Sequence, residues 1–149
     1  AEQLAIACEA HRRLQGGAGS GTDVATSLYG GVVGVEFPAA GGVPRVTPLA
    51  WPQGLESLAV WTGRSASTPA MLARLRAWQQ VHAAPAAGHL ARLGAASSRG
   101  LAAWRAGDAA GVLAAVGHFA DGLRQLDDAV GLGIWSAEHR EIAALAAEA

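Results

Sequence analysis

Residues 16–31 read GGAGSGTDVATSLYGG, and the interpretation of the whole chain starts from this stretch. Four of its first six residues are glycines, which permit sharp turns and a close approach of the backbone to a bound group. One acid, Asp23, follows them, and a run of small residues then leads to the pair Gly30 and Gly31. The pattern predicts the end of one helix, a glycine loop, and a second helix that opens near Asp23.

Taken alone, this glycine loop has two interpretations. Its backbone amides and the N-terminus of the following helix can hold an anion. The alternative is that Asp23 or Thr22 only caps that helix. The loop lacks the Gly-Lys-Ser/Thr of a Walker motif and does not follow a strand as a dinucleotide fingerprint does. The loop by itself therefore does not identify a function.

The amino-acid composition indicates which classes of protein this chain can belong to. The 149 residues are 51% hydrophobic and 15% charged, which is typical of a globular chain. All eleven cations are scattered arginines, so the sequence predicts no nucleic-acid partner. The single cysteine, Cys8, excludes an internal disulfide and is predicted to be a small buried residue. The five histidines show no metal-ligand spacing and no apolar run reaches about 18 residues, so we expect a cytoplasmic protein without a membrane partner.

Hydrophobic periodicity predicts an α+β fold. A helix is expected over 1–14 and a short one from residue 23, followed by strands over 30–37, 44–49 and 55–62. Four helices follow: one from Thr68, one over 86–105, one capped by Asp108 and one capped by Ser136. We expect one short antiparallel sheet with helices on one face, and a helical part after a boundary between residues 50 and 51.

A second segment, VWTGRSASTPAML (60–72), has the character of an anion cradle. A predicted strand ends in a loop that carries Arg64 and several hydroxyl groups, and a helix with an early proline follows. Arginine, hydroxyls and free helix N–H groups together suit a phosphate or a carboxylate. The alternative is a hydroxyl-rich connection with an exposed arginine.

Together the two segments resemble the GHMP kinases, the family of galactose, homoserine, mevalonate and phosphomevalonate kinases. The run GSGTDVATSLYGG (19–31) is similar to the second motif of that family. EAHRRLQG (9–16) and WTGRSASTPAML (61–72) look most like the phosphomevalonate kinase branch, and the likeness continues through WRAGD (104–108) to EHREIAALAAEA (138–149). The resemblance implies a two-domain fold, with 1–50 from the N-terminal domain and 51–149 from a ferredoxin-like C-terminal domain without its last strands.

The resemblance also implies an activity and a set of site residues. The activity is ATP- and Mg²⁺-dependent phosphorylation of phosphomevalonate or a related acid in isoprenoid precursor synthesis. Asp23 matches the catalytic aspartate, Gly19 a nucleotide contact, and Glu9 a Mg²⁺ ligand, although Glu9 has the alternative of an exposed helix carboxylate. Related kinases pair the aspartate with a lysine, which this chain lacks. Substrate binding is implied for Ser20, Gly21, Arg64, Ser65, Ser67 and Thr68.

Two family motifs are absent from the 149 residues: a Pro-x-x-x-Gly-Leu-Gly-Ser-Ser phosphate loop and a Gly-Ala-Gly-Gly-Gly turn. We therefore expect the chain to be the acceptor-side portion of a larger kinase, and to be inactive alone because positioning of the triphosphate is most of the catalysis. Three alternatives stay open: a mevalonate or sugar kinase, a related decarboxylase, and a non-catalytic module completed by a partner chain. A homodimer is also left open.

Overall fold

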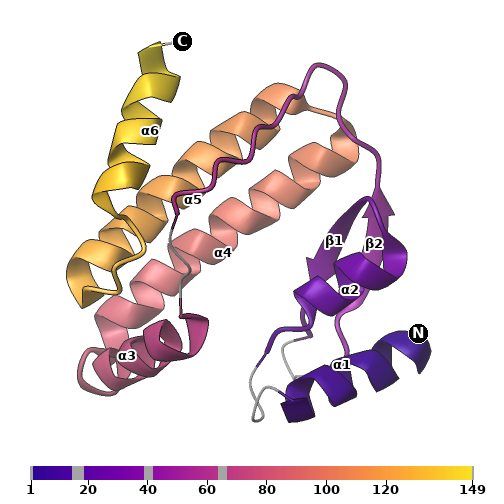
Figure 1. The fold of residues 1–149 in the computed structure, drawn as a ribbon, viewed down its shortest axis with the longest axis horizontal. Helices are drawn as coiled ribbons and strands as arrows, with labels where there is room; N and C mark the ends of the chain where they lie inside the picture. The colour runs from indigo at the N-terminus through magenta and orange to yellow at the C-terminus, as the bar shows by residue number, and fades with distance from the viewer. Residues whose placement is uncertain (1, 15–18, 39–41, 64–66, 149) are drawn as a thin grey trace.

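The computed structural model describes residues 2–14, 19–38, 42–63 and 67–148. This part of the chain is α+β, mostly helical with a two-stranded antiparallel sheet, which confirms the predicted fold class (Figure 1). The elements in chain order are α1 (Glu2–Leu14), α2 (Thr22–Tyr29), β1 (Val32–Glu36), β2 (Arg45–Leu49), α3 (Thr68–Val81), α4 (Ala83–Ala106), α5 (Ala109–Val130) and α6 (Ala137–Glu148).

The first four elements form a small unit, here called the N-terminal unit. β1 and β2 pair antiparallel, with Val35 opposite Val46 and Glu36 opposite Arg45. Helices α1 and α2 cover one face of this hairpin, and the core between them is built on Leu4, Cys8 and Ala25. The prediction that Cys8 is a buried small residue is confirmed.

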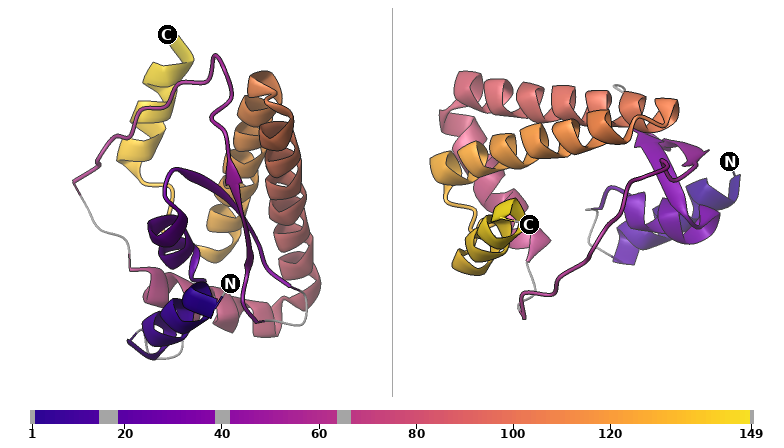
Figure 2. Two further views of the ribbon diagram at one scale, coloured as in Figure 1. Left: turned by 90° about the vertical axis from the view of Figure 1, so that its right-hand side faces the viewer. Right: turned by 90° about the horizontal axis from the view of Figure 1, so that it is seen from above.

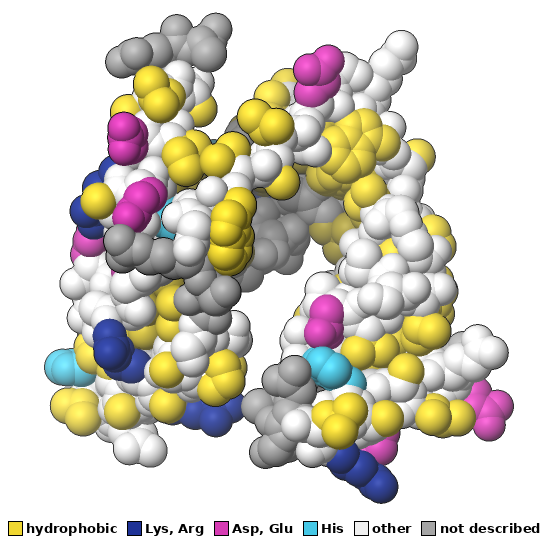
Figure 3. All heavy atoms as spheres, in the orientation of Figure 1, with side chains coloured by type: hydrophobic (Ala, Val, Ile, Leu, Met, Phe, Trp, Pro, Cys, Tyr) yellow, Lys and Arg dark blue, Asp and Glu magenta, His cyan; other side chains and the backbone are white. Residues whose placement is uncertain are grey.

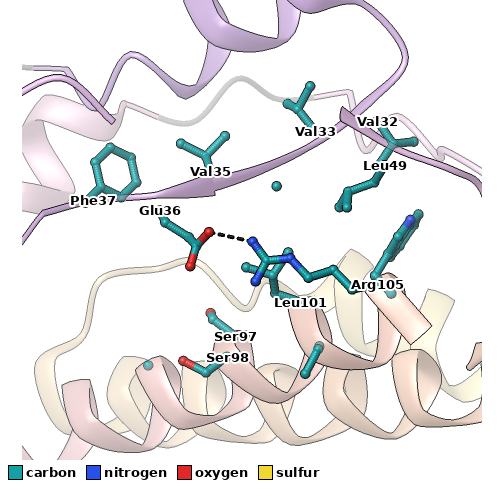
Figure 4. Close-up of a pocket in the computed structure, with 15 residues that line it drawn as sticks. Val32, Val33, Val35, Glu36, Phe37, Leu49, Ser97, Ser98, Leu101 and Arg105 are labelled. Atoms are coloured by element: carbon teal, nitrogen blue, oxygen red, sulfur yellow. Dashed lines mark hydrogen bonds and ion pairs between the residues drawn. The ribbon is translucent and has the colours of Figure 1, made fainter. Parts of the chain in front are cut away.

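The second face of the hairpin is covered by α4. Side chains alternate along a strand, so Val33 and Val35 point away from α4 while Glu36 points toward it (Figure 4). Glu36 pairs with Arg105 of α4, and the absence of a side chain at Gly34 leaves room for Leu101. The expectation that helices cover only one face of the sheet was therefore wrong.

Helices α4 and α5 lie antiparallel along most of their length and form the longest part of the molecule (Figures 1 and 2). Gly107 ends α4 in the left-handed conformation with φ 69°. The Asp108 carboxylate then accepts the Gly111 N–H at 2.9 Å, which confirms the predicted cap of α5. Buried small residues on the facing sides, Ala96 and Ala115, allow the two helices to pack closely.

The predicted third strand, 55–62, is wrong. These residues form no strand, and the segment runs apart from the α4–α5 pair, with 88% of Leu58 and 72% of Trp61 exposed (Figure 2). The chain just before this segment is held to α4, where Trp104 donates from Nε1 to the Ala50 carbonyl at 2.8 Å. A high β-propensity gives a strand only when a neighbouring strand supplies the ladder, and β1 and β2 pair with each other. Within the described ranges, no helix is both long enough and apolar enough to cross a membrane.

Candidate functional site

An open hollow of about 780 Å³ lies beside the N-terminus of α2 and is called here the Asp23 hollow. It joins the two segments that the sequence singled out, because residues of the glycine loop and α2 line it together with Thr68, the first residue of α3. The space-filling view shows an open gap between the N-terminal unit and the helices beyond it (Figure 3). The lining residues are His11, Gly19, Ser20, Thr22, Asp23, Thr26, Ser27 and Thr68.

Asp23 is the carboxylate of this hollow, and its side chain is 66% exposed. Its Oδ2 lies 3.2 Å from Nε2 of His11, and its Oδ1 accepts the Val24 N–H at 2.9 Å. The N-cap of α2 is Gly21, and no side chain caps the helix. The alternative that Asp23 or Thr22 is only a helix cap was therefore wrong. A negative charge in the first turn still interacts favourably with the helix dipole.

The glycine loop holds α2 against α1. Gly21 is buried with φ 75°, and a Cβ there would lie 2.7 Å from Sγ of Cys8, so the position requires glycine. Gly19, with φ 125°, lets the backbone pass the His11 ring, since a Cβ there would lie 3.4 Å from Nδ1. Ser20 Oγ lies 3.0 Å from Thr22 Oγ1, and both residues line the hollow.

The other predicted substrate contacts are only partly gathered here. Ser20 and Thr68 line the Asp23 hollow together with Gly19, the predicted nucleotide contact. Gly21 lines a smaller neighbouring hollow of about 240 Å³ with Cys8 and Arg12. Ser67 is the exposed N-cap residue of α3 and is not among the lining residues. Arg64 and Ser65 lie outside the described residues.

Glu9, the predicted Mg²⁺ ligand, is not among the residues that line the Asp23 hollow. Its carboxylate is paired with Arg13 at 2.8 Å and with Arg12 at 2.9 Å, both on the same helix. The hydrogen bond from Arg13 and the charge of Arg12 hold the pKa of Glu9 below its usual range. This geometry fits the alternative of an exposed helix carboxylate. No group of three or more His, Cys, Asp or Glu that could hold a metal occurs in the part of the chain that the structure describes.

Sequence reasoning missed His11. The histidines were tested only for metal-ligand spacing, a test that says nothing about a single histidine beside a carboxylate. A usable signal existed, because His11 occupies the last turn of the helix that leads into the glycine loop. A chain that turns back through glycines brings that last turn close to the start of the next helix.

A second hollow, of about 810 Å³, lies between β1 and α4 on the other face of the hairpin (Figure 4). Its main charged groups are Glu36 and Arg105, which pair with each other. Hydrogen bonds from Arg45 and Arg105 hold the pKa of Glu36 below its usual range. Because these charges are already matched, this hollow has the character of a packing interface rather than a reaction site.

Comparison with models of known protein families, with curated proteins and with solved structures finds no match to this chain. A function for this chain is therefore inferred from the sequence motifs and from the geometry of the Asp23 hollow.

Proposed function

We propose that this chain supplies the acceptor side of an ATP-dependent small-molecule kinase of the GHMP type, acting in the cytoplasm. The proposed acceptor is phosphomevalonate or a related phosphorylated acid. In this proposal residues 1–50 belong to the N-terminal domain of such a kinase, and 51–149 belong to its ferredoxin-like C-terminal domain.

The observation that supports the proposal is the lining of the Asp23 hollow. Two segments distant in the sequence contribute to it, one with Gly19, Ser20 and Asp23 and the other with Thr68. The kinase resemblance expects acceptor contacts at Ser20 and Thr68, the catalytic carboxylate at Asp23 and a nucleotide contact at Gly19. The hollow offers one carboxylate and several hydroxyl groups, which suits the orientation of a polar, oxygen-rich acceptor.

In the proposed reaction an acceptor phosphate oxygen forms a bond to the γ-phosphorus of ATP. The bond from that phosphorus to the β–γ bridging oxygen breaks, and ADP leaves with the electron pair. A phosphate acceptor is already anionic at neutral pH, so the reaction needs little proton removal. Asp23 would orient the acceptor, and Ser20 and Thr68 would donate hydrogen bonds to its oxygens.

The described residues do not form a cluster of carboxylates that would hold Mg²⁺ by itself. Asp23 is the only described carboxylate that lines the hollow, and the Glu9 carboxylate is paired with arginines elsewhere. A Mg²⁺ ion in kinases is held largely by substrate phosphates and one or two carboxylates. Mg²⁺ would therefore be held mainly by the substrate phosphates, and the described part of the hollow offers it one carboxylate, that of Asp23.

Titration of the 149-residue chain with 5-phosphomevalonate, followed by amide NMR spectra, tests the acceptor site. We expect the largest shifts at residues 19–23 and at Thr68. Mevalonate and galactose serve as comparison ligands, because tighter binding of either would assign a different member of the kinase family.

Two alanine variants form a matched pair for this titration. Thr68→Ala removes a hydroxyl from the hollow and should weaken acceptor binding roughly fivefold, the usual value of one hydrogen bond. Ser98→Ala removes a hydroxyl from the hollow between β1 and α4 and should leave binding unchanged. Binding with equal loss in both variants, or shifts confined to the second hollow, would contradict the proposed site.

Measurement of ATP turnover tests the catalytic part of the proposal. The 149 residues contain no phosphate-loop motif, so we expect no ATP turnover by the purified chain. Joining a GHMP phosphate-loop segment to the chain should bring acceptor-dependent ADP release. Turnover by the unmodified chain that depends on Asp23 would show that the phosphate loop is not required.

A second candidate function is a non-catalytic module that is completed by a partner chain. The observation that favours it is the segment 55–62, which has the composition of a strand but lacks a ladder and exposes large apolar side chains. A module of this kind would bind no phosphorylated acceptor at the Asp23 hollow, so the NMR titration separates the two candidates.

A further inference from the structure

We propose that His11 is the positioning residue for Asp23. It donates a hydrogen bond from Nε2 to the Asp23 carboxylate and holds the remaining lone pairs of that carboxylate toward the hollow. This inference rests on the proposed function, because the group to be positioned is the one that would meet the acceptor.

The geometry restrains the imidazole more than the carboxylate. The His11 side chain is 24% exposed, and its Nε2 lies 3.2 Å from Asp23 Oδ2. On its other edge the ring lies against the backbone at Gly19, where a Cβ would be 3.4 Å from Nδ1. The ring is thus held between the loop and α2, and the exposed carboxylate takes its orientation from the better-buried partner.

The charges of the hollow give this pair a chemical role. The chain has no lysine, and no arginine is among the described residues that line the hollow. His11 is therefore the one lining residue in the described part of the chain that can carry a positive charge. The Nε2–H group directed at Asp23 partly offsets the carboxylate charge, which otherwise repels an anionic acceptor at close range.

The pair also leaves the carboxylate able to bind an acceptor. An ionised carboxylate has about four acceptor positions. Two are used by the Val24 N–H and by His11. The others remain for a donor on the acceptor, so the arrangement suits a molecule that carries both a phosphate and a hydroxyl group.

Two isosteric substitutions separate positioning from simple packing. His11→Gln places an amide nitrogen near the position of Nε2 and keeps the donor to Asp23. His11→Asn places its amide nitrogen near Nδ1 and loses that donor. We expect His11→Asn to weaken 5-phosphomevalonate binding roughly tenfold and His11→Gln to stay within about threefold of the unsubstituted chain.

A spectroscopic measurement on the 149-residue chain tests the bond itself. In ¹⁵N spectra of the imidazole rings, Nε2 of His11 should carry a proton, and its signal should shift in Asp23→Asn. The ring of His118, exposed on α5, serves as an internal control and should not change. Amide spectra of every variant establish that it is folded.

The outcomes distinguish the two proposals. If the unsubstituted chain does not bind 5-phosphomevalonate, the proposed function fails, and the positioning role fails with it. If the chain binds and His11→Asn binds equally well, only the positioning role is overturned. A His11 Nε2 signal that is insensitive to Asp23→Asn also overturns it, even if a histidine variant does not fold.

Discussion

The first turn of α2 and the last turn of α5 each contain an aspartate, and the two carboxylates are used in opposite ways. Asp127 is 8% exposed and accepts the N–H groups of Gly133 and Trp135, both at 2.7 Å. Asp23 is largely exposed and, among the described residues, accepts one backbone N–H, that of its neighbour Val24.

The pKa of Asp127 reflects its hydrogen bonds to the backbone. Burial alone would raise the pKa of Asp127, but the backbone N–H groups of residues 132–135 outweigh it and hold that pKa below its usual range. The Asp127 carboxylate therefore stabilises the turn between α5 and α6 by accepting its backbone N–H groups. A carboxylate that serves structure has its acceptor positions filled by the protein, whereas Asp23 keeps positions open toward a hollow.

The largest expected effect concerns turnover and separates the two aspartates by function. In a protein that joins a phosphate loop to these residues, Asp23→Asn should lower kcat roughly 10²-fold, because the acceptor loses the carboxylate that orients it. Steady-state kinetics with 5-phosphomevalonate measure it. A near-normal kcat would remove Asp23 from the reaction and leave it a surface acid of α2.

The next effect concerns stability and uses the same substitution at both sites. Asp127→Asn keeps the shape but turns an amide NH₂ toward backbone donors, so the free energy of unfolding should fall by roughly 2–3 kcal/mol. Asp23→Asn should change it by less than about 1 kcal/mol, because the side chain is exposed. Urea unfolding of both variants gives the comparison, and equal losses would contradict the division between them.

A smaller effect tests the glycine loop that sets the position of Asp23. Gly21→Ala should destabilise the chain by roughly 2 kcal/mol, because the residue has positive φ and the new Cβ would meet Cys8. Gly107→Ala is the matched control, since Gly107 has the same left-handed conformation, with φ 69° and ψ 18°, and nothing lies within 4 Å of the added Cβ. Its cost of about 1 kcal/mol measures the backbone conformation alone. An equal cost at both positions would show that the contact with α1 is unimportant.

Much of the fold was predictable because local signals and tertiary packing agree. Glycine marks the entry to α2 at Gly21, and the capping aspartate Asp108 with its following apolar stripe predicted α5. The failed strand, 55–62, shows the limit of such signals, since strand formation depends on a partner that no local window contains.

The candidate site was predictable only in part, for a different reason. The glycine loop and the segment around Thr68 were identified by residue type, but the His11–Asp23 pair depends on how α2 packs against α1. Asp127 and Asp128 are adjacent and chemically identical, yet only Asp127 is buried. The turn after α5 makes that difference, and residue type alone does not reveal it.

The smallest expected effect is a pH dependence that arises from Asp127. Because the pKa of this carboxyl is lower in the folded chain than its usual value of 3.8, the unfolded chain takes up a proton first as the solution is acidified. The stability that Asp127 contributes is thus complete above about pH 4–5 and is lost as the pH falls through the folded-state pKa.

The slope that this one group adds is at most about 1.4 kcal/mol per pH unit. Urea unfolding of the unsubstituted chain and of Asp127→Asn, followed from pH 6 to pH 3, should show the difference in stability between them shrinking toward the acid end. Glu9 and Glu36 also have lowered pKa values, but they titrate in both proteins and cancel in the difference. If the difference in stability stays constant with pH, the charge of Asp127 does not stabilise the fold, and only the packing of its side chain does. Asp127 and Asp23 would then differ in burial and not in the use of their charge.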